Sequence, residues 1–261
     1  MSSLLHYSRT GSGEGRPVVV LIHGLFGDLN NLAVIRRHIE SDYDVLSIDL
    51  PDHGQSPRLT TFTLNDAVEC LATTLEHANV SKATFIGHSL GGKVAMRFAL
   101  VYPDKVVQLI AADIAPVSYP PRHQAVIAGL ENVSLSNLTS RKQADEQMAV
   151  HIKEAGVRQF LLKSLYQQEN GEWAWKFNLA GLKESYENIS GWEDINATYS
   201  GDVLFIKGAS SDYLQTSHRH TIAKYFPHAK AHIIEGAGHW LHAEKPQAFN
   251  SIVDKNLKKC N

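Results

Sequence analysis

A serine flanked by glycines stands at residues 87–91 (GHSLG), which match the pattern G-x-S-x-G of an activated nucleophile. An apolar run at residues 83–86 precedes it, and a helical stretch rich in Ala and Leu follows it. On such a strand-to-helix turn the serine is held away from the sheet, and the glycines allow the sharp turn without clashes. The N-terminus of the following helix adds positive potential where an oxyanion would form. Ser89 is therefore predicted to attack a carbonyl carbon.

A serine nucleophile needs a general base, and His239 in residues 236–240 (GAGHW) is the strongest candidate among the 14 histidines. It follows the last apolar run of the chain, where a loop can place an imidazole over the carboxyl edge of a parallel sheet. His88 is the neighbour of the predicted nucleophile, so its side chain should point elsewhere, and we interpret it as structural. His23 and His53 each precede a glycine and are expected to brace loops.

An oxyanion hole is the third part that such chemistry requires. Residues 23–27 (HGLFG) follow the first strong apolar run, and a loop bracketed by glycines can aim backbone N–H groups at a carbonyl oxygen. The expected donors are the N–H of Leu25 and the N–H of Leu90, the residue after the nucleophile.

The elements that must position these residues are apolar runs without polar alternation, which suit strands buried on both faces of a parallel sheet. Six such runs are predicted to be strands: residues 17–22, 43–48, 83–86, 106–112, 203–206 and 231–234. Helical patterns stand between them at residues 29–39, 64–75 and 90–101. The alternation predicts an α/β fold with a doubly wound, mostly parallel sheet.

One stretch breaks this alternation. Residues 117–199 carry helix-like patterns, no convincing buried strand, and nine of the 22 aromatic side chains. We interpret them as a helical cap inserted between two sheet strands, with residues 1–116 and 200–261 forming the core domain. The aromatic content suggests an apolar acyl pocket, and plain packing of extra helices on the sheet is the alternative.

Composition excludes several classes of protein. With 25 basic and 27 acidic residues the formal charge is −2, which argues against a nucleic-acid partner. No run of 18 apolar residues predicts a membrane span, and the polar first 15 residues do not resemble a signal peptide. Two cysteines cannot form a disulfide framework, so we expect reduced thiols and a cytoplasmic location. His228 and His232 lack a third ligand at a suitable spacing, so no metal and no cofactor are expected.

Four motifs occur in the order found in the α/β-hydrolase superfamily: HGLFG at residues 23–27, DLPDHGQS at 49–56, GHSLGGK at 87–93 and GHW at 238–240. Within it, the chain resembles the YbfF-type bacterial esterases in residues 112–117 (ADIAPV) and 239–246 (HWLHAEKP). The resemblance extends from about residue 5 to residue 257. It implies a core domain with a helical cap, and hydrolysis of carboxylic esters or of acyl-CoA thioesters.

The acid that orients His239 has two candidates. The order serine, acid, histidine fits Asp113, which ends the strand after the nucleophile, and also Asp212, which follows the strand after the cap. Many superfamily members place the acid three residues after the glycine that here is Gly208, and Ser211 occupies that position. This departure favours Asp113, a position that some relatives use.

The sequence thus predicts a serine hydrolase that cleaves small-molecule esters through an acyl-enzyme, with Ser89, His239 and Asp113 as its triad. The alternatives are thioester or C–C bond hydrolysis on the same triad, and a non-catalytic hydrolase-like scaffold. Five basic residues could present positive charge to the phosphates of coenzyme A: Lys93, Arg97, Arg122, Arg158 and Lys163.

Overall fold

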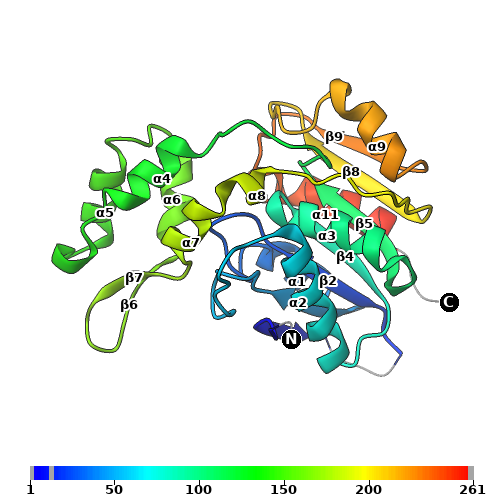
Figure 1. Ribbon diagram of the computed structural model, residues 1–261, viewed down its shortest axis with the longest axis horizontal. Helices are drawn as coiled ribbons and strands as arrows, with labels where there is room; N and C mark the ends of the chain where they lie inside the picture. Colours follow the sequence, from blue (N-terminus) through cyan, green and yellow to red (C-terminus); the bar gives the residue numbers. More distant parts are fainter. Residues whose placement is uncertain (1–2, 12–14, 258–261) are drawn as a thin grey trace.

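A seven-stranded sheet forms the centre of the computed structural model, which describes residues 3–11 and 15–257 (Figure 1). Cys260, one of the two predicted reduced thiols, lies outside the described residues, and Cys70 is a buried free cysteine. Within the described ranges no helix is long and apolar enough to cross a membrane.

The strand order is β1-β3-β2-β4-β5-β8-β9. All neighbouring strands run parallel except β1, which pairs antiparallel with β3 at one edge. The six predicted strands are all present, within one or two residues of their predicted ends. The strands are β1 (Tyr7–Thr10), β2 (Val18–Ile22), β3 (Asp44–Ile48), β4 (Ala83–His88), β5 (Val106–Ala112), β8 (Asp202–Gly208) and β9 (Lys230–Ile234).

Helices cover both faces of this sheet, because the central strands are apolar on both sides. In β2, Val19 and Leu21 face one cluster of buried side chains, while Val20 and Ile22 face the other. The helices of the core are α1 (Ala33–Ile39), α2 (Leu64–His77), α3 (Leu90–Val101), α9 (Arg219–Tyr225), α10 (Leu241–Glu244) and α11 (Pro246–Asn256). Short 3₁₀ turns stand at Pro103–Lys105, Leu135–Asn137 and Thr216–His218.

The helix ends follow from local sequence. The Thr63 hydroxyl accepts a hydrogen bond from the N–H of Asp66 at 3.0 Å and caps α2. Helix α3 ends before Pro103, as the sequence predicted. Helix α1 begins at Ala33 rather than at residue 29, because the carboxylate of Asp28 and the amide of Asn31 bond to local N–H groups and form turns instead.

Residues 117–199, called here the insertion, lie between β5 and β8 and are mainly helical. Their helices are α4 (Gln124–Glu131), α5 (Arg141–Met148), α6 (Ala155–Leu162), α7 (Leu179–Glu184) and α8 (Tyr186–Ser190). Figure 1 shows α4 to α7 gathered to one side of the sheet, with α8 leading back to it. A short hairpin, β6 (Leu165–Gln167) and β7 (Trp173–Trp175), belongs to this group and was not predicted, because its strands are only three residues long and partly exposed.

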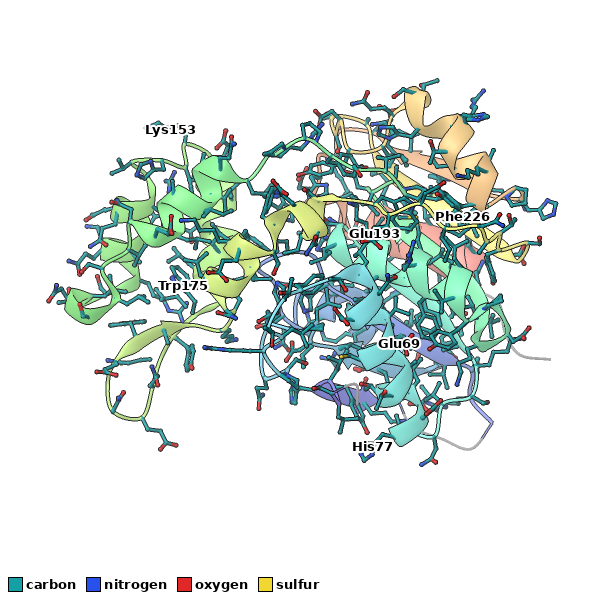
Figure 2. The ribbon with its side chains drawn as sticks, viewed as in Figure 1. Glu69, His77, Lys153, Trp175, Glu193 and Phe226 are labelled. Carbon is teal, nitrogen blue, oxygen red and sulfur yellow. The ribbon has the colours of Figure 1, made fainter. Side chains whose placement is uncertain are left out.

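The insertion is fastened to the core at the end of α8. The ammonium of Lys93, on α3, donates hydrogen bonds to the carbonyls of Ile189, Ser190 and Gly191, at 3.4, 2.6 and 2.8 Å. Burial lowers the pKa of Lys93 to about 7, while the three carbonyl acceptors at a helix C-terminus favour the charged form. Figure 2 shows Trp175 in the insertion, well away from Glu69 and Phe226 on the core.

Candidate active site

Ser89 lies on a strained turn between β4 and α3. Its backbone has φ 53° and ψ −119°, a conformation that residues with a Cβ rarely adopt. The two motif glycines are required by close approach, since a Cβ on Gly87 would lie 2.3 Å from the carbonyl oxygen of Gly91. A Cβ on Gly91 would lie 2.2 Å from the carbonyl oxygen of Ile22. The turn therefore presents the serine at the carboxyl edge of the sheet, partly exposed.

The structure brings Ser89, His239 and Asp113 into one hydrogen-bonded line. The Ser89 hydroxyl donates to Nε2 of His239 at 3.1 Å, and Nδ1–H of His239 donates to Oδ2 of Asp113 at 2.7 Å. The imidazole comes from the loop after β9, and the carboxylate from the residue after β5. In this arrangement the carboxylate fixes the tautomer that leaves Nε2 free to accept the serine proton.

Asp113 is fully buried, and both oxygens of its carboxylate accept hydrogen bonds. Besides His239, its donors are the N–H of Gly208, at 3.0 Å from Oδ1, and the hydroxyl of Ser211, which bonds to Oδ2. Three donors satisfy a charge that would otherwise be costly to bury. Sequence reasoning missed this role of Ser211, although its place three residues after Gly208 was a usable signal.

The structure pairs Asp212 with a side chain other than the imidazole. Its side chain is 68 % exposed and accepts a hydrogen bond from the guanidinium of Arg122 at 2.6 Å. That hydrogen bond lowers the pKa of Asp212. The same guanidinium lies 4.8 Å from the ring of Tyr213, and that ring stacks on His239 at 3.9 Å. Arg122 and Tyr213 thus border the site; the sequence suggested Arg122 only as a positive charge for coenzyme A, and it did not single out Tyr213.

The predicted oxyanion loop passes directly beside the nucleophile. A Cβ on Gly24 would lie 3.2 Å from Cβ of Ser89, closer than an ordinary contact, so glycine favours this approach. The carbonyl of Gly24 accepts hydrogen bonds from Nδ1–H of His23, at 2.7 Å, and from the N–H of Gly27, at 3.1 Å. Because this carbonyl and the N–H of Leu25 belong to one planar trans peptide, the N–H points the opposite way. It has no acceptor in the described part of the chain.

Leu90 supplies the second predicted donor. It is the first residue of α3, so its N–H has no acceptor within the helix. Leu25, Ser89 and Leu90 line one small cavity together. The two residues that carry the predicted donors therefore border the same space as the serine, where an oxyanion hole would have to lie.

An apolar cavity of about 360 Å³ opens on Ser89 and His239. Its wall combines core residues such as Phe26 and Trp240 with side chains of α4 and α6. The lining residues from the insertion are Arg122, His123, Ala125, Val126, Ile152, Glu154, Val157, Phe160 and Leu161. A larger polar cavity of about 640 Å³ contains neither Ser89 nor His239.

Four of the five basic residues considered for coenzyme A do not line this cavity. Lys93 and Arg97 are buried and hold the backbone of the insertion, and Arg158 pairs with Asp145 at 2.8 Å. Arg122 lines the cavity and is paired with Asp212, and Lys93 lines the smaller cavity beside Ser89 while its ammonium is bonded to carbonyls of the insertion. Each of Lys93, Arg97, Arg122 and Arg158 thus has a partner within the protein, and a site for the phosphates of coenzyme A stays a prediction.

Buried histidines brace the loops around the site. His53 accepts the N–H of Phe26 on Nε2 at 3.1 Å, and His23 accepts the N–H of Leu50 at 3.0 Å. His88 donates from Nε2 to the carbonyl of His239 at 2.8 Å and contacts the ring of His242. Burial lowers the pKa of His53 and of His242 to about 3, and it lowers the pKa of His23 and His88. These imidazoles are neutral in the folded protein.

Acid should therefore destabilise the fold. Below pH 6.5 the unfolded chain binds protons at His53 and His242 that the folded protein does not bind, so stability falls as the pH falls. Each group should remove about 1.4 kcal/mol of unfolding free energy per pH unit between about pH 6 and pH 4. Urea unfolding at several pH values measures this slope, and His242→Gln should flatten it. A free energy that stays constant from pH 7 to pH 5 would contradict the expectation.

The α/β-hydrolase fold family matches residues 17–246 of the chain. The chain belongs to this family, and its fold and relatives make it a carboxylic ester hydrolase. Esterase YbfF of Escherichia coli strain K12 is 43 % identical over 240 residues, with 92 % of each chain covered. The sn-1-specific diacylglycerol lipase ABHD11 of Danio rerio is 36 % identical over 251 residues, covering 93 % of this chain and 78 % of that protein.

A solved structure, described as a marine microorganism esterase, has the same fold over nearly the whole chain. The two superpose with a TM-score of 0.94 at 33 % sequence identity, covering 98 % of this chain and all of the other. The predicted similarity to YbfF-type esterases and the predicted α/β-hydrolase fold are confirmed.

Proposed function

We propose that the protein hydrolyses carboxylic esters through a covalent acyl-enzyme formed on Ser89. The observation that carries the proposal is the hydrogen-bonded line from Ser89 through His239 to Asp113, beside two unpaired N–H groups. Ser89 Oγ attacks the ester carbonyl carbon while Nε2 of His239 takes its proton. The carbonyl oxygen becomes an oxyanion, which the N–H groups of Leu25 and Leu90 stabilise.

Collapse of this tetrahedral intermediate breaks the bond to the alcohol, which leaves with the proton from His239. A water molecule then attacks the acyl-enzyme, with His239 again as base, and releases the carboxylic acid and free Ser89. Asp113 keeps the imidazole oriented and stabilises its charged form in both halves of the reaction. The residues perform every step, so the proposal requires no metal and no cofactor.

The insertion, residues 117–199, acts in this proposal as a cap that binds the acyl chain. Its support is the apolar wall that α4 and α6 contribute to the cavity on Ser89. A cavity of about 360 Å³ is within the usual size range of small-ligand sites. The diacylglycerol lipase relatives are named for an acylglycerol ester substrate, which agrees with an apolar site.

A panel of p-nitrophenyl esters and coenzyme A thioesters with matched acyl chains tests the proposal. Hydrolysis of the esters should depend on Ser89 and should be most efficient for chains that fill the apolar cavity. Because Arg122 and Arg158 are each paired with a carboxylate, thioesters should be poorer substrates than esters of equal chain length. Ester turnover no faster than in Ser89→Ala would contradict the proposed function.

Narrowing the cavity from the cap should change chain-length preference. Val126 lies on α4, is partly exposed and lines the cavity, so Val126→Trp should fill part of the acyl site. We expect kcat/KM for octanoyl and longer esters to fall about tenfold or more relative to acetyl esters, because the longer chain loses apolar contacts. Val150→Trp, at a 60 % exposed position of the insertion, is the control. An unchanged ratio in Val126→Trp would show that the acyl chain binds elsewhere.

A further inference from the structure

A buried hydroxyl of the insertion is hydrogen-bonded to the predicted oxyanion loop, residues 23–27. Ser164, between α6 and β6, donates a hydrogen bond from Oγ to the carbonyl oxygen of Phe26 at 3.0 Å. Its side chain is only 2 % exposed, and its backbone is fixed by hydrogen bonds with Leu161 and Lys176. The donor is therefore held in place from the side of the insertion.

The residue that accepts this bond has a strained backbone. Phe26 has φ 62°, in the left-handed region that residues with a Cβ disfavour, so its conformation depends on the contacts around it. Its N–H donates to Nε2 of His53 at 3.1 Å, and its ring packs against Phe177 at 5.0 Å. Ser164 and Phe177 both belong to the insertion, which therefore holds this turn of the core.

Two peptide planes connect the hydroxyl to the oxyanion donor. Ser164 fixes the carbonyl of the Phe26–Gly27 peptide, and the N–H of that same peptide donates to the carbonyl of Gly24 at 3.1 Å. The Gly24 carbonyl belongs to the Gly24–Leu25 peptide, whose N–H is the predicted oxyanion donor. Because each peptide is a rigid plane, fixing one end of the series sets the direction of the other. Hydrogen bonds in series also polarise one another, which strengthens the terminal donor.

We propose that Ser164 is a positioning residue for the oxyanion hole, acting on the N–H of Leu25 through these two peptides. This inference rests on the proposed function, since it needs that N–H to stabilise an oxyanion. It gives the insertion a part in the chemistry besides shaping the acyl site. The ester in its ground state does not need the donor at an exact distance, whereas the transition state does.

The test compares two buried serines of the insertion. Ser164→Ala removes the bond to Phe26, and Ser185→Ala removes a bond in which Ser185 Oγ accepts the N–H of Phe62 at 2.9 Å. The two side chains are 2 % and 3 % exposed, and each bond joins the insertion to the core. Ser185 does not line the cavities on Ser89, so its variant measures the effect on activity and stability of losing any buried hydrogen bond between the insertion and the core.

We expect Ser164→Ala to lower kcat about tenfold with KM within twofold, a fraction of the 10²- to 10³-fold loss for removing an oxyanion donor outright. Inhibition by butylboronic acid, whose tetrahedral adduct with the serine occupies the oxyanion hole, should weaken by a similar factor. Ser185→Ala should keep kcat, KM and boronic acid inhibition within twofold of the unmodified chain. Melting temperatures show whether the two variants lose comparable stability.

Equal kcat values in the two serine variants would overturn the inference, as would a loss confined to KM. Unchanged boronic acid inhibition in Ser164→Ala would also overturn it, because the oxyanion donor would then be intact. Ser89→Ala, measured in the same assay, separates this outcome from failure of the proposed function. If Ser89→Ala is inactive while Ser164→Ala is unimpaired, the inference alone is wrong.

Discussion

Replacing Ser89 by alanine is expected to lower kcat for ester hydrolysis by roughly 10⁴-fold or more. The nucleophile and its base act as a unit, so loss of the serine oxygen removes both the acyl-enzyme route and the use of His239. The residual rate would come from the oxyanion donors and substrate binding alone. Steady-state kinetics with a p-nitrophenyl ester measures this loss.

The same substitution should leave the fold intact. The change removes one oxygen from a partly exposed side chain, and the strained backbone of the turn is held by its neighbours. The melting temperature should therefore stay close to that of the unmodified chain. Activity of Ser89→Ala above about a tenth of the original, at an unchanged melting temperature, would exclude Ser89 as nucleophile.

The second large effect is expected at Asp113. In the unmodified chain both carboxylate oxygens of Asp113 accept hydrogen bonds, Oδ1 from the N–H of Gly208 and Oδ2 from Nδ1–H of His239. In Asp113→Asn an NH₂ group replaces one of these oxygens, so one of the two donors faces another donor. The imidazole can relieve a conflict at Nδ1 only by taking the wrong tautomer, which costs up to about 10⁴-fold in kcat. We therefore expect Asp113→Asn to be severely impaired in kcat.

Asp212→Asn is the matched comparison. Its carboxylate is largely exposed and bonds to Arg122 rather than to His239, so kcat should stay within about threefold of the unmodified chain. The reverse pattern of the two single variants would assign the acid to Asp212. Mild losses in both, with a severe loss in the double variant, would mean that the two carboxylates substitute for each other.

The strands, the nucleophile turn and the helix after it were predictable from short-range sequence features. The run at residues 106–112 has no polar alternation and became β5 with the same bounds. Likewise, the glycines at positions 87 and 91 indicate a turn in which the backbone approaches too closely for a Cβ at either position. Such features depend on a few adjacent residues, so one sequence suffices to recognise them.

Contacts between distant segments were not predictable in the same way. The hydroxyl of Ser211 meets the carboxylate of Asp113 only because β5 and β8 are neighbours, although they are separated by the whole insertion. The bond from Ser164 to Phe26 likewise depends on how the insertion packs on the core. The edge strand β1 was missed because its residues are only partly buried and lack a continuous apolar run.

The most direct test of the account is covalent labelling with a fluorophosphonate, followed by peptide mapping by mass spectrometry. Such reagents phosphonylate a serine only when a base and an oxyanion hole activate it. We predict one label per chain, on Ser89, in the peptide that contains GHSLG, and none on Ser89→Ala. A chain that hydrolyses esters but carries its label on another residue, or no label at all, would contradict the proposed acyl-enzyme mechanism.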